Sequence, residues 1–290
     1  MQALNMSDVF LMGLLGLLGL LVGSFLNVVI HRLPKMMEMR WAAECAELHR
    51  PHERAADEAL PEPATFNLMV PRSRCPQCGH PIRWFENIPI ISYIVLRGRC
   101  SHCAASISLR YPLVELLCGA LFAWCGWKWG ATWEALAWCV FSASVITLAC
   151  IDWDTTLLPD DITLPLLWAG LCAAGLGLID TDLPHAVWGA VAGYMSLWLV
   201  YWAFKLVTGK EGMGYGDFKL FAAFGAWFGW QALIPVILMA SVIGAVMGIA
   251  IKFMGQLREG GYVPFGPFLA IASLTAMIFG PTAILAFIGL

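Results

Sequence analysis

Long apolar stretches separated by short polar segments run through most of the chain, and this pattern predicts an all-α polytopic membrane protein. A helix needs about 20 mostly apolar residues to cross a bilayer. The first stretch lacks a basic n-region and a clear small-residue cleavage site, which favours a retained helix over a signal peptide. We expect about eight transmembrane helices, near residues 9–30, 111–128, 132–151, 162–179, 185–206, 217–230, 232–254 and 264–289.

The composition agrees with this prediction. Of the 290 residues, 60% are hydrophobic and 13% are charged, and the mean hydropathy is +0.73. Average soluble proteins carry about 25% charged residues, so a soluble domain of this length could not hide so much apolar surface. The net charge of -3 also argues against nucleic acid as a partner.

The lysines and arginines orient the predicted helices. With eight spans, all but one of the 17 basic residues fall on one side of the membrane, and Lys128 is the exception. The positive-inside rule makes the crowded side cytoplasmic. We therefore expect a bacterial inner-membrane protein whose main polar loop is cytoplasmic and whose two termini are periplasmic. The short sixth span is supported by the same pattern, because without it Lys252 and Arg258 would lie outside.

One long polar segment divides the chain into three predicted parts. These are a first transmembrane helix at 1–30, a cytoplasmic domain at 31–110 and a helical membrane domain at 111–290. Residues 36–66 are rich in Ala, Glu and Arg. They predict one helical stretch followed by a Pro-containing segment at 60–63.

Cysteines in the polar segment form two pairs at metal-ligand spacing: Cys75, Cys78, Cys100 and Cys103. Two such turns can direct four thiolates at one metal, and four sulfurs suit zinc in a structural site. The gap between the pairs is slightly longer than in most zinc ribbons, and a reducing cytoplasm disfavours disulfides. We therefore predict a small zinc-ribbon-like domain. His80 and His102 neighbour the pairs, either as alternative ligands or as ordinary surface histidines.

Two aspartate clusters lie at the ends of predicted spans. The first, at residues 151–161, follows the third span and contains Asp152 and Asp154, and the second is Gly214-Tyr215-Gly216-Asp217 at the start of the sixth. Acidic residues at membrane depth are costly, so each is a candidate for a functional site. Both clusters fall on the predicted cytoplasmic side, where they can face each other across a helix bundle.

Paired carboxyl groups have the chemistry that peptide hydrolysis by water needs. The ionised one takes a proton from the water, and the protonated one polarises the carbonyl. Two other interpretations stay open on these residues alone. A Gly-x-Gly-Asp segment is also typical of a glycine loop before a helix N-cap aspartate, and intramembrane aspartates also line proton or cation pathways in transporters.

The motifs, in this order and spacing, resemble those of the type IV prepilin peptidases, within the Gly-x-Gly-Asp membrane aspartyl proteases. The resemblance extends over nearly the whole chain. It rests on Gly-Ser-Phe-Leu-Asn-Val-Val-Ile-His-Arg-Leu-Pro at 23–34, Glu-Asn-Ile-Pro-Ile-Ile-Ser-Tyr at 86–93, Leu-Arg-Gly-Arg at 96–99, Asp152 with Pro159-Asp160, and Gly214-Tyr215-Gly216-Asp217.

The resemblance implies two activities. One is cleavage of the short basic leader of type IV prepilins and type II secretion pseudopilins, after a Gly, at the cytoplasmic membrane face. The other is methylation of the new N-terminal amine with S-adenosylmethionine as donor. Asp152 and Asp217 match the catalytic pair, with Asp154 as the alternative to Asp152. The four cysteines match a metal site that the family ties to methyl transfer.

The donor site and two rival functions remain open. No Gly-x-Gly-x-x-Gly follows a strand, so a Rossmann-type donor site is unsupported, and we place the donor between the cysteine pairs, up to Gly98. An ion- or proton-coupled transporter would need a polar path across the membrane. A zinc-ribbon scaffold without catalysis would leave the aspartates unexplained. Neither His-Glu-x-x-His nor Gly-x-Ser-x-Gly is present, which argues against metallo- and serine-type proteolysis.

Overall fold

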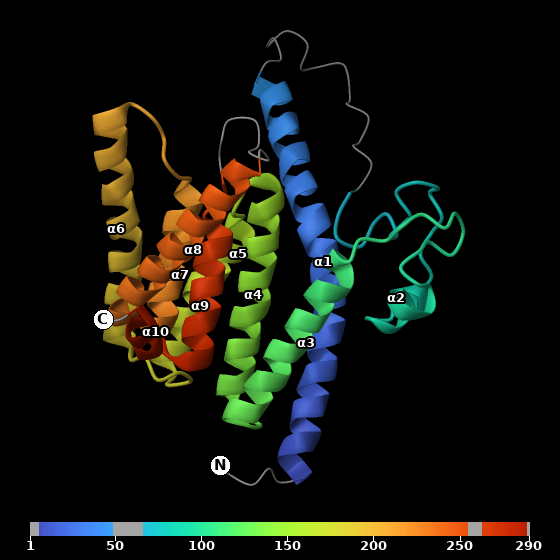
Figure 1. The fold of residues 1–290 in the computed structure, drawn as a ribbon, viewed down its shortest axis with the longest axis horizontal. Coiled ribbons are helices and arrows are strands. Elements are labelled where there is room, and N and C mark those ends of the chain that lie inside the picture. The colour runs from blue at the N-terminus through green and yellow to red at the C-terminus, as the bar shows by residue number, and fades with distance from the viewer. Residues whose placement is uncertain (1–5, 49–65, 255–262, 289–290) are drawn as a thin grey trace. The chain divides into compact units, whose positions relative to one another are not determined.

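The computed structural model describes residues 6–48, 66–254 and 263–288 (Figure 1). The predicted Pro-containing segment and Arg258 lie outside these ranges. Within them the chain is helical apart from its loops, which confirms the all-α prediction. The β pairing found there consists of two isolated antiparallel bridges, so the segment with the cysteine pairs is built from turns rather than strands.

The chain divides into two compact units. One comprises residues 13–123 and the other residues 124–290 together with 1–12, and we call them the 13–123 unit and the 124–290 unit. The 13–123 unit contains most of α1 (Met6–Leu48), the short helices η2 (Trp84–Asn87) and α2 (Ile91–Val95), and most of α3 (Arg110–Trp129).

Helix α1 is longer than predicted. The first span was expected near residues 9–30, with a helical stretch in the loop after it, and in the structure one helix continues to Leu48 and contains Pro34. The reason is local propensity: residues 36–48 are mostly Met, Ala, Glu and Leu, which favour helix strongly. The predicted helical stretch is therefore confirmed up to Leu48, and the structure joins it without a break to the first apolar helix.

Glycines let α1 and α3 pack closely. A Cβ added to Gly19 would lie 2.7 Å from the carbonyl oxygen of Cys118, and one added to Gly23 would lie 2.7 Å from the Cα of Glu115. Side-chain amides add to this contact, since Asn27 Nδ2 donates to the carbonyl of Tyr111 over 3.1 Å. Such small-residue faces are a common means of helix association in membranes.

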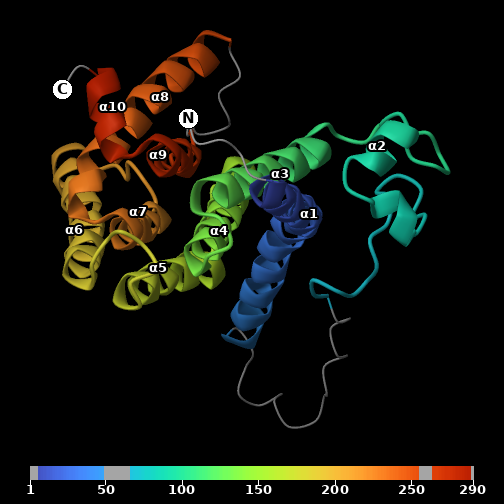
Figure 2. The ribbon, with the colours of Figure 1, turned by 90° about the horizontal axis from the view of Figure 1, so that it is seen from below.

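The 124–290 unit is a helical bundle around α7. Ten of the 14 residues of α7 are buried, and Figure 2 shows α7 next to α5, α6 and α9. The elements are α4 (Trp133–Thr155), α5 (Asp160–Gly175), α6 (Leu183–Thr208), α7 (Tyr215–Phe228), η3 (Trp230–Ala232), α8 (Leu233–Phe253), α9 (Gly266–Phe279) and α10 (Pro281–Ile288).

Two kinds of contact hold α7 in the bundle. Gly189 of α6 and Gly225 of α7 face each other so closely that neither position has room for a Cβ. On the other side, the indole Nε1 of Trp227 donates to the carbonyl of Leu166 in α5 over 2.9 Å, and its ring fills the space beside Gly170. The polar start of α7 is therefore fixed in place by its apolar remainder.

All eight predicted spans are helical, but their lengths differ from the prediction. Four helices among the described residues are long and apolar enough to cross a membrane: α1, α4, α6 and the continuous η3–α8 segment. The last predicted span is two helices, α9 and α10, because Gly280 (φ 86°) and Pro281 break it. Together with the many large apolar side chains exposed on these helices, this identifies an integral membrane protein, whereas the count of eight spans stays a prediction.

Candidate active site

Asp152 lies in the last turn of α4. Its side chain is only 5% exposed, whereas Asp154, two residues later, is exposed. The helix ends at Thr156, which adopts a left-handed conformation and donates its N–H to the Asp152 carbonyl over 2.9 Å. The end of α4 thus points Asp152 inward and Asp154 outward, which favours Asp152 over its alternative.

Asp217 lies in the first turn of α7 and is 6% exposed. The N-cap of this helix is Gly214, so Asp217 is the third helical residue. The interpretation of Asp217 as an N-cap is therefore wrong. Its Oδ1 atom is buried without a hydrogen-bond partner among the residues that the structure describes.

The structure brings the two aspartates together. The carboxyl groups of Asp152 and Asp217 are close enough that the charge of one acts on the other. Both are buried at the ends of neighbouring helices in the 124–290 unit. Buried carboxyl groups this close disfavour each other's charged form, so the pair is suited to hold a single proton.

A third element completes this site, and the sequence analysis missed it. The backbone N–H of Gly266, at the start of α9, donates to Asp152 Oδ2 over 2.9 Å. A Cβ on Gly266 would lie 2.5 Å from the same oxygen, so only glycine fits. The signal in the sequence was the Gly266-Pro267 pair at a helix start, because proline is favoured in the first turn.

The two aspartate segments also contact each other directly. A Cβ on Gly216 would lie 2.7 Å from Leu158 Cβ, which gives the second glycine of the motif a steric reason. Lys219 Nζ contacts both carboxylate oxygens of Asp160 at 2.7 Å. Lys219 therefore offsets the negative charge of Asp160, one of the four aspartates in the segment at 151–161.

The buried hydroxyl groups among the described residues of this unit are each paired with a nearby backbone carbonyl. The side chains of Ser142, Thr147, Thr163 and Ser273 each donate to a backbone carbonyl three or four residues earlier. A transporter would need ionisable or hydrated groups in succession. Among the described residues of the bundle, Asp152 and Asp217 are the buried carboxylates, and both lie at the same end of the bundle.

The four paired cysteines form a second candidate site, in the 13–123 unit. The Sγ atoms of Cys75, Cys78, Cys100 and Cys103 all lie within 4.8 Å of one another, and Cys75 Sγ is 3.8 Å from Cys103 Sγ. A tetrahedral zinc site with Zn–S bonds of ~2.3 Å has S–S edges of roughly 3.8 Å. The donor set and its spacing therefore fit one zinc ion.

Both Cys-x-x-Cys turns have the same backbone design. Cys75 N–H donates to the His80 carbonyl and Cys100 N–H to the Ala105 carbonyl, and each turn ends on a residue with positive φ. Backbone N–H groups of Cys78 and Gln77 lower the pKa of the Cys75 thiol to about 6, whereas desolvation and hydrogen bonds from the neighbouring thiols raise the pKa of Cys78 to about 12. The thiols therefore titrate as a coupled group.

The histidines beside the cysteines lie outside this group of four thiols. The rings of His80 and His102 stack with centroids 5.3 Å apart, and His80 Nε2 lies 3.8 Å from Glu86 Oε2. The two imidazole rings are therefore not part of the candidate donor set, which consists of the four sulfur atoms.

The segment between the cysteine pairs is tied to α3. Glu115 Oε2 accepts the backbone N–H of Ile90 over 2.8 Å, and Ile90 has a positive φ of 60° just before α2. Glu115 is 8% exposed and also interacts with Ser24 of α1. This carboxylate, which the sequence analysis left without a role, anchors the loop to both helices of its unit.

Comparisons with known proteins agree with these features. The model of the bacterial peptidase A24 N-terminal domain matches residues 17–129, and that of the type IV leader peptidase family matches residues 139–249. A prepilin leader peptidase/N-methyltransferase from Stutzerimonas stutzeri is 54% identical over 264 residues, which cover 91% of this chain and 89% of the relative. No solved structure matches the chain.

Relatives in other organisms have the same name. Those from Pseudomonas aeruginosa and Aeromonas hydrophila are each 52% identical over 264 residues, with the same coverage of both chains. Identity at this level over nearly the whole length confirms the resemblance that the aspartate and cysteine motifs indicated. The chain therefore belongs to the type IV leader peptidase family.

Proposed function

We propose that this chain is a membrane-embedded aspartic peptidase that removes the leader of type IV prepilins and type II secretion pseudopilins, and that it N-methylates the new N-terminus. The observation that carries the peptidase is the buried carboxyl pair, Asp152 and Asp217, at adjoining helix ends. The names of the relatives support both activities.

The surroundings of the two carboxyl groups favour different roles for them. Asp152 Oδ2 accepts the Gly266 N–H at the start of α9, and a hydrogen bond donated to a carboxylate favours its ionised form. Asp152 is then the base. Asp217, whose Oδ1 lacks a partner among the described residues, is the acid that holds the shared proton.

Hydrolysis follows from these roles. Asp152 takes one proton from a water molecule while the water oxygen bonds to the scissile carbonyl carbon, and Asp217 gives its proton to the carbonyl oxygen. The tetrahedral diol then collapses. The C–N bond breaks as one diol hydroxyl returns its proton to Asp217, and the amine nitrogen of the mature pilin takes up the proton that Asp152 had received.

Methylation uses the amine that cleavage releases. Bound S-adenosylmethionine would supply the methyl group for this amine. Cys75, Cys78, Cys100 and Cys103 would hold a zinc ion, whose closed four-sulfur site supplies folding energy to a loop with little core of its own.

We further propose the predicted topology and domain division. Eight spans place the cysteine site, Asp152 and Asp217 on the cytoplasmic side of a bacterial inner membrane, with both termini periplasmic. The lysine and arginine distribution supports this orientation. Residues 31–110 are then the cytoplasmic metal-binding part, and residues 111–290 the peptidase part.

Incubation of the detergent-purified chain with a prepilin, with and without S-adenosylmethionine, tests the proposal. Mass analysis of the product should show loss of the leader in both reactions and one added methyl group only when the donor is present. An uncut prepilin would refute the peptidase, and a cut but unmethylated product in the presence of donor would refute the methyltransferase.

A further inference from the structure

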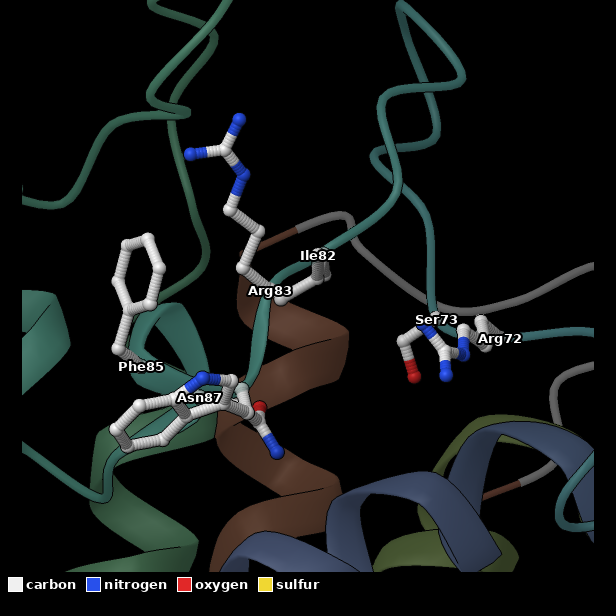
Figure 3. A pocket seen from close by; sticks show the side chains of 7 residues that line it. Arg72, Ser73, Ile82, Arg83, Phe85 and Asn87 are labelled. Carbon is white, nitrogen blue, oxygen red and sulfur yellow. The ribbon is translucent and has the colours of Figure 1, made fainter.

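A concave pocket in the 13–123 unit contains none of the aspartates assigned to peptide cleavage. Its volume is about 460 Å³, within the roughly 300–1,000 Å³ of small-molecule sites. Figure 3 shows Arg72 and Ser73 on one side of it and Phe85 and Asn87 on the other. Among the lining residues, the side chains that can form ionic, stacking or amide contacts with a ligand are Arg72, Arg83, Trp84, Phe85 and Asn87.

The first Cys-x-x-Cys turn holds the walls of this pocket in place. Ile82 N–H donates to the Ser73 carbonyl over 2.8 Å and joins the two segments that enter and leave the turn. Arg83 N–H donates to Glu86 Oε2 over 2.8 Å, and the same oxygen lies 3.8 Å from His80 Nε2. The shape of the pocket therefore depends on the cysteine site.

The aromatic side chains of the pocket are available to a ligand. Trp84 is 81% exposed and Phe85 is 46% exposed, and their rings meet edge to face with centroids 5.8 Å apart. The guanidinium of Arg83 lies 5.8 Å from the Phe85 ring centroid. Exposed aromatic rings grouped with arginines mark binding surfaces more often than they serve stability.

We propose that this pocket binds S-adenosylmethionine, an inference that rests on the proposed methyltransferase function. The donor has an adenine ring, a ribose, a sulfonium cation, and a methionine part with an α-ammonium and an α-carboxylate. Trp84 and Phe85 provide faces for the adenine ring and the cation. Arg72 provides a fork for the carboxylate, and the Asn87 amide can both donate to and accept from an adenine edge.

The dependence of the pocket on the cysteine turn explains why a metal site would matter to methyl transfer. A closed four-cysteine site leaves no open position for chemistry. It can still support the donor by fixing residues 73–86, which contain the turn and most of η2. An anionic lipid headgroup is the other ligand that arginines and tryptophan can bind at a membrane surface, but the concave shape and the Asn87 amide favour the donor.

Equilibrium dialysis of methyl-labelled S-adenosylmethionine with the full chain in detergent tests this pocket. Trp84→Leu and Arg72→Gln change exposed side chains, so the fold should be kept. Each removes a proposed contact with the donor and should raise the Kd for S-adenosylmethionine by about tenfold or more. Leader cleavage and zinc content should stay unchanged. Trp230→Leu and Arg99→Gln, which change exposed residues outside the pocket, are the matched controls and should bind the donor as the unaltered chain does.

The outcomes separate this pocket from the proposed function. Unchanged donor affinity in both pocket variants, with methylation intact, would overturn the pocket and leave the methyltransferase standing. If the unaltered chain neither binds nor uses the donor, the methyltransferase itself falls. Flotation with phosphatidylglycerol vesicles addresses the lipid, because variants that lose vesicle binding but keep donor affinity would show a headgroup site and overturn the proposal.

Discussion

The backbone N–H of Gly266 donates to Asp152 Oδ2 over 2.9 Å, and this bond joins the start of α9 to the end of α4. The two residues are 114 positions apart in the chain. At this distance there is no room for a side chain at position 266. Helix α9 therefore contributes to the site through its backbone.

Gly266→Ala should therefore reduce leader cleavage strongly. The new Cβ would lie 2.5 Å from Asp152 Oδ2 and displace the carboxylate, and a displacement of about 1 Å at a reacting group can cost roughly 100-fold in rate. Initial cleavage rates of a prepilin measure the effect. Gly248→Ala is the matched control, because a Cβ there meets nothing within 4 Å. Equal rates for the two variants would contradict a positioning role for Gly266.

Exchange of single aspartates for asparagine should separate Asp152 from Asp154. Asp152→Asn and Asp217→Asn each remove one proton-transfer group from the buried pair and should abolish cleavage while the variant still inserts and resists protease like the unaltered chain. Asp154→Asn changes an exposed side chain and should keep cleavage near the normal rate. An inactive Asp154→Asn variant together with an active Asp152→Asn variant would show that Asp154, and not Asp152, is the base.

Sequence patterns predicted the parts of this molecule that depend on local chemistry. Among the described residues, hydropathy located the long helices of the bundle, although it joined α9 and α10 into one span. Burial in lipid or in a helical core selects apolar runs whatever the partner. The positions of Cys75 and Cys78, or of Gly214 and Asp217, fixed their candidate roles because ligand spacing and motif geometry are local.

Contacts between distant segments could not be predicted in the same way. Gly266 touches Asp152, and Glu115 accepts the N–H of Ile90, through tertiary packing that no periodicity encodes. The continuation of the first helix beyond its apolar stretch was also not predicted. Hydropathy stops near residue 30, but helix propensity carries α1 on to Leu48, so the membrane boundary and the helix boundary are different features.

Gly216→Ala should impair cleavage, and a second change should restore it. The added Cβ would lie 2.7 Å from Leu158 Cβ, which forces apart the segments that present Asp152 and Asp217. We expect a loss of roughly 10- to 100-fold. Leu158→Gly removes the clashing side chain, so the double variant should recover most of the rate lost by Gly216→Ala.

Comparison of the four rates in this double-mutant cycle gives the coupling between the two positions. Purely additive losses would mean that Gly216 acts through backbone freedom rather than through its contact with Leu158. The single variant Leu158→Gly serves as the reference, since it shows what the loss of the leucine costs by itself.

Loss of the metal should affect methyl transfer more than cleavage. Cys75→Ser removes one of four sulfurs that lie within 4.8 Å of one another, and a zinc site with three sulfurs and a weaker oxygen ligand should retain much less than one equivalent of metal after dialysis. The turn between Arg72 and Trp84 then loses its fixed structure, so methylation should fall. Leader cleavage should continue, because the aspartate pair lies in the other compact unit.

Atomic emission gives the metal content, and product mass gives both activities. Cys172→Ser, a change at an exposed cysteine of the bundle, should alter none of the three. Normal methylation by a metal-free Cys75→Ser variant would refute the structural role of the cluster, and equal loss of both activities would place its effect on the whole chain rather than on the donor pocket.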